Sequence, residues 1–309
     1  MSLRIAVLVP CRNEAVTVAC VVADFKAALP GATVYVYDNG SRDETGSIAR
    51  GAGAVVRRED VPGKGGVVRR MFAEIDADAY VLVDGDATYD ATRAPELVSM
   101  LVDNGLDMVT AVREHADAGA YRRGHASGNR LLNALLGFLF GRRPTDMLSG
   151  YRALSQRFVK SFPTSAQRFE IETELTVHAL EMRVPSGELA TRYVARPEGS
   201  ASKLNTWRDG FRILRFMARL FRDVRPLLYF ASMAAVLAAV GLALGGSVAL
   251  EFMRTREVPR LPTAVLATGL MLLASLALAC GLILDSVARG RLETKRLAYL
   301  AAGPPNPGN

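Results

Sequence analysis

The sequence predicts an α/β domain built on a mostly parallel sheet, followed by two helices long enough to cross a membrane. Three observations support this fold. Short β-branched runs alternate with amphipathic segments over the first 110 residues. Charged and apolar residues are mixed through 1–225, as in a soluble domain, whereas 226–284 is almost free of charge outside one short loop. The chain of 309 residues has room for one sizeable domain and a smaller second part.

The alternation predicts βα units, in which a helix connects each strand to the next parallel one. The expected strands are Arg4–Val9, Thr33–Tyr37, Ala54–Arg57, Tyr80–Val83 and Met108–Val112. The helices expected between them are Glu14–Leu29, Asp43–Arg50, Lys64–Ile75 and Arg93–Leu101. The region 113–203 is less regular, with expected helices at Ser127–Phe140 and Phe169–Met182 and a strand near Leu189–Val194. Ligands of parallel sheets bind beyond the carboxyl ends of the strands, so the residues that follow each strand are candidates for chemistry.

The C-terminal third predicts attachment to a membrane. Asn205–Phe221 reads as an amphipathic helix lying on the bilayer, with an ordinary surface helix as the alternative. Two apolar segments follow, Leu227–Leu250 and Ala264–Leu284, which as helices would reach about 36 and 32 Å, enough for a bilayer core. A buried helical hairpin in a soluble protein is the alternative for this pair. We therefore expect four parts: an α/β domain at 1–203, an interfacial helix at 204–225, a transmembrane hairpin at 226–285 and a tail at 286–309.

Charge and cysteine usage narrow the class of protein. The formal net charge is +7, and much of the excess lies in basic residues between 203 and 225, just before the first apolar segment. That placement favours anionic lipid headgroups over nucleic acid. Basic residues also flank the outer ends of the apolar pair, which predicts that the α/β domain and both termini lie on the cytoplasmic side of a plasma membrane. The cysteines Cys11, Cys20 and Cys280 form no CxxC pair, so the sequence suggests neither a disulfide framework nor a zinc site.

The motif that points most directly to chemistry is Asp84-Gly85-Asp86, which directly follows the apolar strand Tyr80–Val83. Two carboxylates one residue apart on a loop can face a divalent cation that prefers oxygen ligands, and that cation can bridge phosphates. Asp and Gly are also common in turns, so the spacing alone is weak. Its position at the carboxyl end of the fourth strand favours a cation site over an ordinary turn.

Two further segments suit a nucleotide. Asp38 follows the second strand and can accept hydrogen bonds from a base or a ribose, while Ser41 or Asp43 can cap the next helix. Gly63-Lys64-Gly65-Gly66 can approach phosphates with backbone amides and one ammonium. It matches neither a Walker loop nor the GxGxxG dinucleotide fingerprint, which weakens the ATPase and dehydrogenase readings.

Together these segments resemble a known family. Val9-Pro10-Cys11-Arg12-Asn13-Glu14, Asp38-Asn39-Gly40-Ser41-Arg42-Asp43, Gly63-Lys64-Gly65 and Asp84-Gly85-Asp86 are similar to the inverting family 2 glycosyltransferases of the GT-A fold. The segment 146–152 (Asp-Met-Leu-Ser-Gly-Tyr-Arg) and the segment 193–204 resemble the branch that acts on polyprenyl phosphates, such as dolichyl-phosphate mannose synthases and undecaprenyl-phosphate sugar transferases. The resemblance covers 4–204.

The resemblance implies a role for individual residues. Pro10, Asn13, Glu14, Asp38, Lys64, Asp84, Gly85 and Asp86 would bind the nucleotide-sugar, and Asp84 and Asp86 would hold Mg²⁺ or Mn²⁺. The acceptor phosphate would be gripped by Arg113, Arg123, Ser127, Arg196, Ser202 and Lys203. Asp86, Asp146, Arg123 and Arg196 would take part in catalysis, with Asp146, or one of the glutamates Glu170, Glu172 and Glu174, contacting sugar hydroxyls.

The implied reaction is transfer of a hexose or N-acetylhexosamine from a nucleotide-sugar, with UDP favoured over GDP, to a polyprenyl phosphate at the cytoplasmic face of the membrane. Relatives with paired spans tend to associate, so a dimer or tetramer is expected. Cys11, Arg12 and Gly40-Ser41-Arg42 depart from commoner family patterns, which leaves base and sugar open. Alternatives are a GDP-mannose-dependent mannosyltransferase, transfer to another lipid such as diacylglycerol, a non-catalytic membrane scaffold, and nucleic-acid binding.

Overall fold

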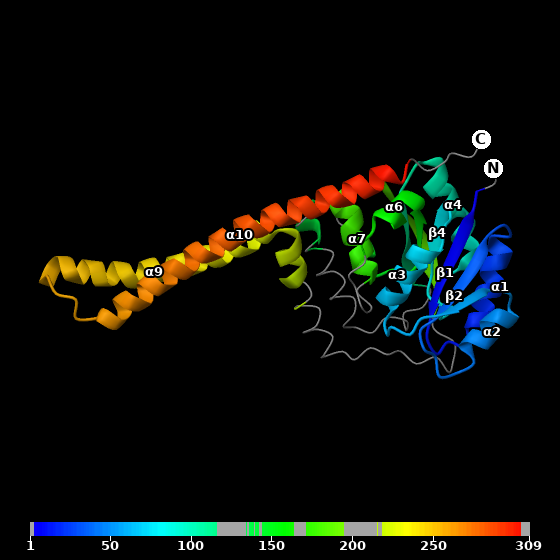
Figure 1. Cartoon of the computed structure of the whole chain (residues 1–309), viewed down its shortest axis with the longest axis horizontal. Coiled ribbons are helices and arrows are strands. Elements are labelled where there is room, and N and C mark those ends of the chain that lie inside the picture. Colours follow the sequence, from blue (N-terminus) through cyan, green and yellow to red (C-terminus); the bar gives the residue numbers. More distant parts are fainter. Residues whose placement is uncertain are drawn as a thin grey trace. The chain divides into compact units, whose positions relative to one another are not determined.

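The computed structural model describes residues 3–115, 134, 136–138, 140–141, 144–163, 171–194, 215 and 218–303. The chain divides into two compact units (Figure 1). The N-terminal unit comprises Met1–Thr206 together with Thr294–Asn309, and the helical unit comprises Trp207–Glu293. The expected helix at Ser127–Phe140 and the expected interfacial helix at Asn205–Phe221 lie largely outside the described residues.

A seven-stranded sheet forms the centre of the N-terminal unit, in the order β3-β2-β1-β4-β6-β5-β7. Its strands are β1 (Ile5–Cys11), β2 (Thr33–Asp38), β3 (Val55–Arg58), β4 (Ala79–Leu82), β5 (Met108–His115), β6 (Arg152–Ser155) and β7 (Ser186–Tyr193). Strands β3, β2, β1 and β4 pair in parallel, as do β5 and β7. The mostly parallel sheet predicted from the alternating pattern is therefore confirmed.

Helices cover both faces of this sheet (Figure 1). They are α1 (Val18–Ala28), α2 (Thr45–Gly51), α3 (Lys64–Glu74), the short 3₁₀ helix η1 (Ala91–Arg93), α4 (Ala94–Asp103), α6 (Gln156–Ser161) and α7 (Ile171–Met182). Apolar residues of α1 and α4 pack in one core with alternate residues of β1 and β4, such as Val7, Val9 and Val81. Because successive strand residues point to opposite faces, Leu8, between Val7 and Val9, faces the other layer, which contains α3, α6 and α7.

Strand β6 was not among the predicted strands. It spans only Arg152–Ser155, and it runs antiparallel to both of its neighbours, β4 and β5. All four of its residues are buried, so the strand lacks the alternation of polar and apolar residues that signals a half-exposed strand. Its insertion places the segment just before it, Ser149–Tyr151, beside the carboxyl end of β4.

The end of the last helix belongs to the N-terminal unit. The Tyr299 hydroxyl donates to Oδ2 of Asp107 at 2.7 Å, and Arg157 lies over the Tyr299 ring at 4.8 Å. Asp107 is fully buried and accepts through Oδ1 from Arg157 Nε at 2.5 Å. Residues near 299 were predicted to form part of a tail, but in the structure they belong to the N-terminal unit.

The helical unit contains α9 (Pro226–Thr255) and most of α10 (Leu261–Ala301), both long and apolar enough to cross a membrane. Small residues line the contact between the two helices. A Cβ added to Gly241 would lie 3.3 Å from the Ala267 carbonyl oxygen, and one added to Gly281 would lie 2.9 Å from Phe230 Cβ. Large apolar side chains such as Leu272 point outward and are exposed. Close backbone packing with an apolar exterior is typical of membrane-spanning helices.

Candidate active site

The carboxyl ends of β1, β2 and β4 bring acidic side chains to one edge of the sheet. β1 ends at Cys11 and β2 at Asp38, and the chain reaches Asp84 and Asp86 just after β4. Burial raises the pKa of the Cys11 thiol, and the charges of Glu14, Asp38, Asp84 and Asp86 raise it further. Four carboxylates therefore surround this thiol within electrostatic range. The sequence predicted this gathering from the position of each residue after its strand.

The loop from Asp84 to Asp86 is fixed by close contacts. The Thr17 hydroxyl donates to the Gly85 carbonyl oxygen at 2.6 Å, and a Cβ on Gly85 would lie 2.5 Å from the Cys11 sulfur. Only glycine fits that position without displacing the thiol. Asp86 is buried, and its Oδ1 accepts from the Thr88 hydroxyl at 2.6 Å. Thr88 thus orients one carboxylate oxygen of Asp86.

Hydrogen bonds beside Asp38 join the loop after β1 to the loop after β2. Asp38 Oδ1 accepts from the Ser41 amide at 2.9 Å, and the Ser41 hydroxyl accepts from the Asn13 amide at 2.9 Å. Asn13 has a left-handed backbone (φ 52°), which asparagine adopts more readily than most residues. Its side-chain oxygen accepts from the Arg42 amide at 2.8 Å. Pro10 precedes this cluster on β1, in register with Tyr37.

Neither residue expected to cap α2 occupies its N-terminal cap position. Glu44 holds that position and makes no side-chain capping hydrogen bond, while Asp43, one residue earlier, accepts from the amide of Thr45, the first residue of α2, at 3.2 Å. The expectation for Ser41 was wrong, because its hydroxyl is used to hold Asn13. Ser41 therefore shapes the loop around Asp38.

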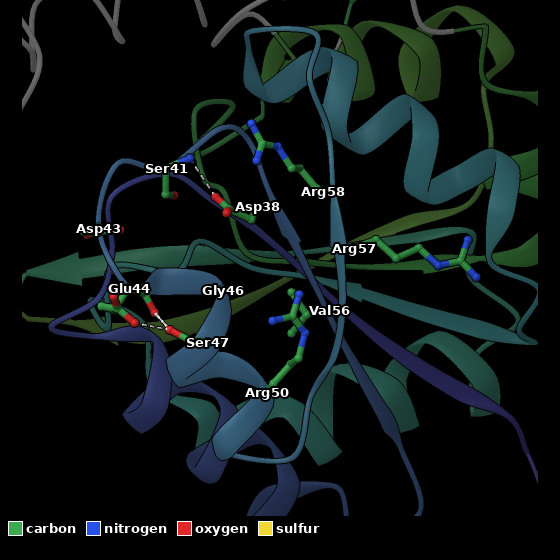
Figure 2. Close-up of a pocket in the computed structure, with 10 residues that line it drawn as sticks. All are labelled: Asp38, Ser41, Asp43, Glu44, Gly46, Ser47, Arg50, Val56, Arg57 and Arg58. Atoms are coloured by element: carbon green, nitrogen blue, oxygen red, sulfur yellow. Dashed lines mark hydrogen bonds between the residues drawn. The ribbon is translucent and has the colours of Figure 1, made fainter.

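A cavity of about 320 Å³ opens next to Asp38 (Figure 2). Figure 2 shows Asp38 and Ser41 at one end of this cavity, with Arg58 next to them, and Arg50 toward the other end. Its lining comes from β2, α2, β3 and the loops between them: Asp38, Ser41, Asp43, Glu44, Gly46, Ser47, Arg50, Val56, Arg57 and Arg58. Carboxylates, hydroxyls and guanidinium groups suit a polar, flat molecule with many hydrogen-bonding groups.

Lys64, the first residue of α3, forms ion pairs with both Asp84 and Glu172. The ammonium and the Glu172 carboxylate are almost completely buried, whereas the Asp84 side chain is 30% exposed. Burial lowers the pKa of Lys64, but the two carboxylates outweigh this and raise it above its ordinary value. Lys64 therefore stays protonated and places a permanent positive charge next to the acidic edge.

Arg113 and Asp146 form a two-point ion pair. Arg113 Nε lies 2.6 Å from Asp146 Oδ2, and Nη2 lies 2.8 Å from Oδ1. Burial raises the pKa of Asp146, but Arg113 reverses the shift and leaves that pKa below its ordinary value. Arg113 also lies over the Tyr193 ring at 5.4 Å. Asp146 is thus an ionised, weakly basic carboxylate.

The segment Ser149-Gly150-Tyr151-Arg152 packs against Asp84 at the acidic edge. A Cβ on Gly150 would lie 2.9 Å from Asp84 Cγ, so a glycine is needed where the two chains meet. The Gly150 amide donates to the Tyr89 hydroxyl at 2.8 Å. Arg152 is fully buried and donates to the Met147 carbonyl oxygen at 2.7 Å; burial lowers its pKa to about 10.

The structure brings together Pro10, Asn13, Glu14, Asp38, Lys64, Asp84, Gly85 and Asp86 around the carboxyl edge, and Arg113 with Asp146 further along the sheet. The other predicted residues, Arg123, Ser127, Arg196, Ser202 and Lys203, lie outside the described residues, as does Glu170. Sequence reasoning did not assign Tyr89 or Gly150. Gly150 lies in the segment 146–152, which resembles the polyprenyl-phosphate branch of the family. Its contact with Asp84 depends on strand β6, which was not predicted.

The donor atoms fit a hard divalent cation. Within the described part of the chain, no three His, Cys, Asp or Glu side chains form a ready-made metal cluster. Asp84 and Asp86 nevertheless present carboxylate oxygens on one short loop, and Mg²⁺ is commonly held by one or two carboxylates together with substrate phosphates. Asp84 and Asp86 are the residues that would hold such an ion.

Comparison with known proteins identifies the family. The model for Glycosyl transferase family 2 matches residues 6–162. The chain is 34% identical over 300 residues to Glycosyltransferase AglJ of Haloferax volcanii, covering 96% of this chain and 98% of that relative. The chain belongs to glycosyltransferase family 2. It is therefore a glycosyltransferase.

Two other similarities concern parts of this family 2 enzyme. A dolichyl-phosphate hexose transferase of Haloferax volcanii is 31% identical over 149 residues, which is 48% of this chain and 65% of that relative. Glucosyl-3-phosphoglycerate synthase from Mycobacterium tuberculosis, solved with Mn²⁺, UDP and phosphoglyceric acid, superposes with a TM-score of 0.58 at 22% identity. That superposition covers 71% of this chain and 78% of the synthase, and it shows that the folds are alike.

Proposed function

We propose that the enzyme transfers a hexose or N-acetylhexosamine from a nucleotide-sugar to a polyprenyl phosphate at a membrane surface, with inversion at the anomeric carbon and with a divalent cation. UDP is the favoured nucleotide. The observation that carries the proposal furthest is the gathering of Asp38, Asp84 and Asp86, with Lys64, at the carboxyl edge of the sheet.

The donor side of the site supports a nucleotide-sugar. The cavity beside Asp38 suits the nucleoside, because Asp38 can accept from a base or ribose and its flanking loops are held by Asn13 and Ser41. From there the edge leads to Asp84 and Asp86, the residues suited to the diphosphate and its cation. The Mycobacterium synthase with a similar fold was solved with UDP and Mn²⁺, which favours the same pairing here.

The acceptor side is supported by chemistry and by similarity. A relative that matches about half of this chain is named a dolichyl-phosphate hexose transferase. Two helices long and apolar enough to span a membrane suit an enzyme whose acceptor is a lipid. We place the catalytic domain and both termini on the cytoplasmic side because basic residues flank the outer ends of the two helices. A dimer or tetramer remains a prediction.

In the proposed reaction, a nonbridging oxygen of the acceptor phosphate attacks the anomeric carbon. The bond between that carbon and the diphosphate oxygen breaks, and its electron pair leaves with the nucleoside diphosphate. A divalent cation held by Asp84 and Asp86 would supply charge neutralisation for this leaving group. Lys64 would add a second positive charge, so that catalysis depends on positioning and electrostatic stabilisation.

The ion pair at Asp146 favours a phosphate acceptor over a lipid hydroxyl. A hydroxyl acceptor requires a general base, whereas an acceptor phosphate is already ionised near neutral pH. Asp146 is held by Arg113 at two points, and its lowered pKa makes it a poor base. We assign Asp146 to the orientation of Arg113, which would face the acceptor phosphate. Arg123, Ser127, Arg196, Ser202 and Lys203 would complete that anion site.

The test offers detergent-purified enzyme a choice of acceptors. With Mn²⁺ and a panel of UDP- and GDP-sugars, we expect a glycolipid product with a short polyprenyl phosphate and none with diacylglycerol. Asp146→Asn should reduce the rate without changing acceptor choice. Product from diacylglycerol that disappears in Asp146→Asn would instead identify Asp146 as a general base and overturn the choice of acceptor.

A further inference from the structure

Lys64 bridges two carboxylates that belong to different parts of the N-terminal unit. Asp84 follows β4, and Glu172 lies in the first turn of α7, far from Lys64 in sequence. Both carboxylates contact the same ammonium nitrogen. These three side chains together carry a net negative charge, and the buried Arg152 guanidinium lies within electrostatic range of Glu172.

The two carboxylates differ in their surroundings. The Glu172 side chain is 8% exposed, whereas Asp84 is 30% exposed. A buried carboxylate needs a cationic partner, because removing it from water without one is costly. A more exposed carboxylate can exchange its partner for water or for an ion at lower cost. Glu172 is therefore the fixed partner of Lys64, and Asp84 is the exchangeable one.

Asp84 is also the residue suited to a divalent cation. In the structure its Oδ1 is occupied by the Lys64 ammonium. A cation and an ammonium on the same oxygen repel each other, so a cation that binds Asp84 Oδ1 should displace Lys64 from that oxygen. A nucleoside diphosphate would give Lys64 a new anionic partner at the same edge.

We propose that Glu172 is a positioning residue that anchors Lys64, and that Lys64 exchanges Asp84 for the donor diphosphate when the cation binds. This inference rests on the proposed function, since it assumes a diphosphate at the acidic edge. It predicts that cation and diphosphate each strengthen the binding of the other, because each removes Lys64 from Asp84 or stabilises it elsewhere. Such coupling between two ligands is reciprocal.

The experiment measures binding, with no acceptor present. Mn²⁺ affinity is followed by electron paramagnetic resonance with and without nucleotide, and UDP or GDP affinity by calorimetry with and without Mn²⁺. In the wild-type enzyme we expect each ligand to tighten the other by about tenfold, within the range usual for coupled sites.

Two variants separate the proposal from a merely structural role. In Lys64→Met/Glu172→Gln, which removes both buried charges together, Mn²⁺ binding without nucleotide should become stronger because Asp84 is released. Nucleotide affinity should fall by about tenfold or more, as expected for a lost charge-assisted contact. In Glu172→Gln, Asp84 is the only negative charge left of the two that pair with Lys64, so Mn²⁺ binding without nucleotide should weaken, and so should nucleotide binding.

The matched control is Glu181→Gln, which breaks another lysine–glutamate pair; its glutamate is also on α7, and its lysine is Lys295 on α10. It lies nine residues from Glu172 on α7, about 14 Å along the helix, and should leave both affinities at the wild-type level. Equal loss of Mn²⁺ and nucleotide binding in Lys64→Met/Glu172→Gln would overturn the exchange. Wild-type affinities in Glu172→Gln would overturn the anchor.

The outcomes distinguish this inference from the proposed function. Absence of sugar transfer to polyprenyl phosphate, with the coupled binding of nucleotide and Mn²⁺ intact, contradicts the proposed acceptor and leaves the exchange standing. Transfer with the wrong binding signature contradicts only the exchange. A wild-type enzyme that binds neither UDP nor GDP contradicts both.

Discussion

Replacing Gly150 with alanine should disable the site without unfolding the protein. The added Cβ would lie 2.9 Å from Asp84 Cγ, and closer still to one carboxylate oxygen. Carbon atoms in contact prefer separations of about 3.5–4.0 Å, so the Asp84 carboxylate must shift by about 1 Å. Lys64, paired with Asp84, would move with it or lose the contact.

The size of the effect follows from that shift. A displacement of about 1 Å at a reacting centre can cost about 100-fold in rate. We therefore expect kcat/KM of Gly150→Ala to fall by about two orders of magnitude, with weaker Mn²⁺-dependent binding of UDP. The assay is initial-rate transfer from a radiolabelled nucleotide-sugar, with binding followed by calorimetry.

A second glycine supplies the control. No atom lies within 4 Å of a Cβ added to Gly31, so Gly31→Ala should retain activity. The thermal midpoint and circular dichroism of Gly150→Ala should stay close to those of Gly31→Ala. Full activity in Gly150→Ala would refute the argument that this backbone contact positions Asp84.

Three other predictions concern the cation, the ion pair and the end of the last helix. Asp86→Ala, or removal of divalent cations with EDTA, should abolish transfer, and Mn²⁺ should restore it only in the wild type; persistent activity in EDTA would exclude a cation requirement. The lowered pKa of Asp146 means that its pair with Arg113 stabilises the fold above about pH 4, the unfolded value, and that this contribution is lost as pH falls toward the folded value. Asp146→Asn should therefore lower the thermal midpoint at pH 7, with the difference narrowing below pH 4; a difference that is independent of pH would contradict this. Tyr299→Phe removes the hydrogen bond to buried Asp107 and should cost about 1.5–3 kcal/mol, seen as a lower melting midpoint, whereas an unchanged midpoint would show that the helix end contributes little.

The sequence predicted the alternating strands and helices of the N-terminal unit well, because the patterns that mark them are local. Strands β1 to β5 alternate with helices, and the expected segments agree with the observed ones within a few residues. The position of Asp38 and Asp84 after their strands then follows from the geometry of parallel sheets. The two apolar helices were equally visible, because their composition alone marks them.

Strand β6 and its consequences were hidden for a physical reason. Arg152–Ser155 is short and buried on every residue, and it contains an arginine that the structure satisfies with carbonyl oxygens from a neighbouring loop. Nothing in the local pattern separates such a segment from a loop. The contact between Gly150 and Asp84 depends on that strand, so it could not be predicted either.

Partners between charged residues were also beyond the sequence. Arg113 was predicted as an acceptor ligand and Asp146 as a separate catalytic residue, yet the structure pairs them. Glu172 was one of three glutamates with equal claims, and only the fold directs it to Lys64. Such pairs depend on distances between elements far apart in the chain, and the spacing of residues in the sequence does not predict those distances.

The most direct test of the central claim is to identify the product. Wild-type enzyme, a short polyprenyl phosphate, Mn²⁺ and each UDP- or GDP-sugar in turn are incubated, and the lipid fraction is analysed by mass spectrometry. We predict a species heavier than the acceptor by one sugar residue, with the sugar linked through the phosphate, formed by the wild type and absent with Asp86→Ala. Sugar transferred to a lipid hydroxyl, or a product that forms equally well with Asp86→Ala, would contradict the account.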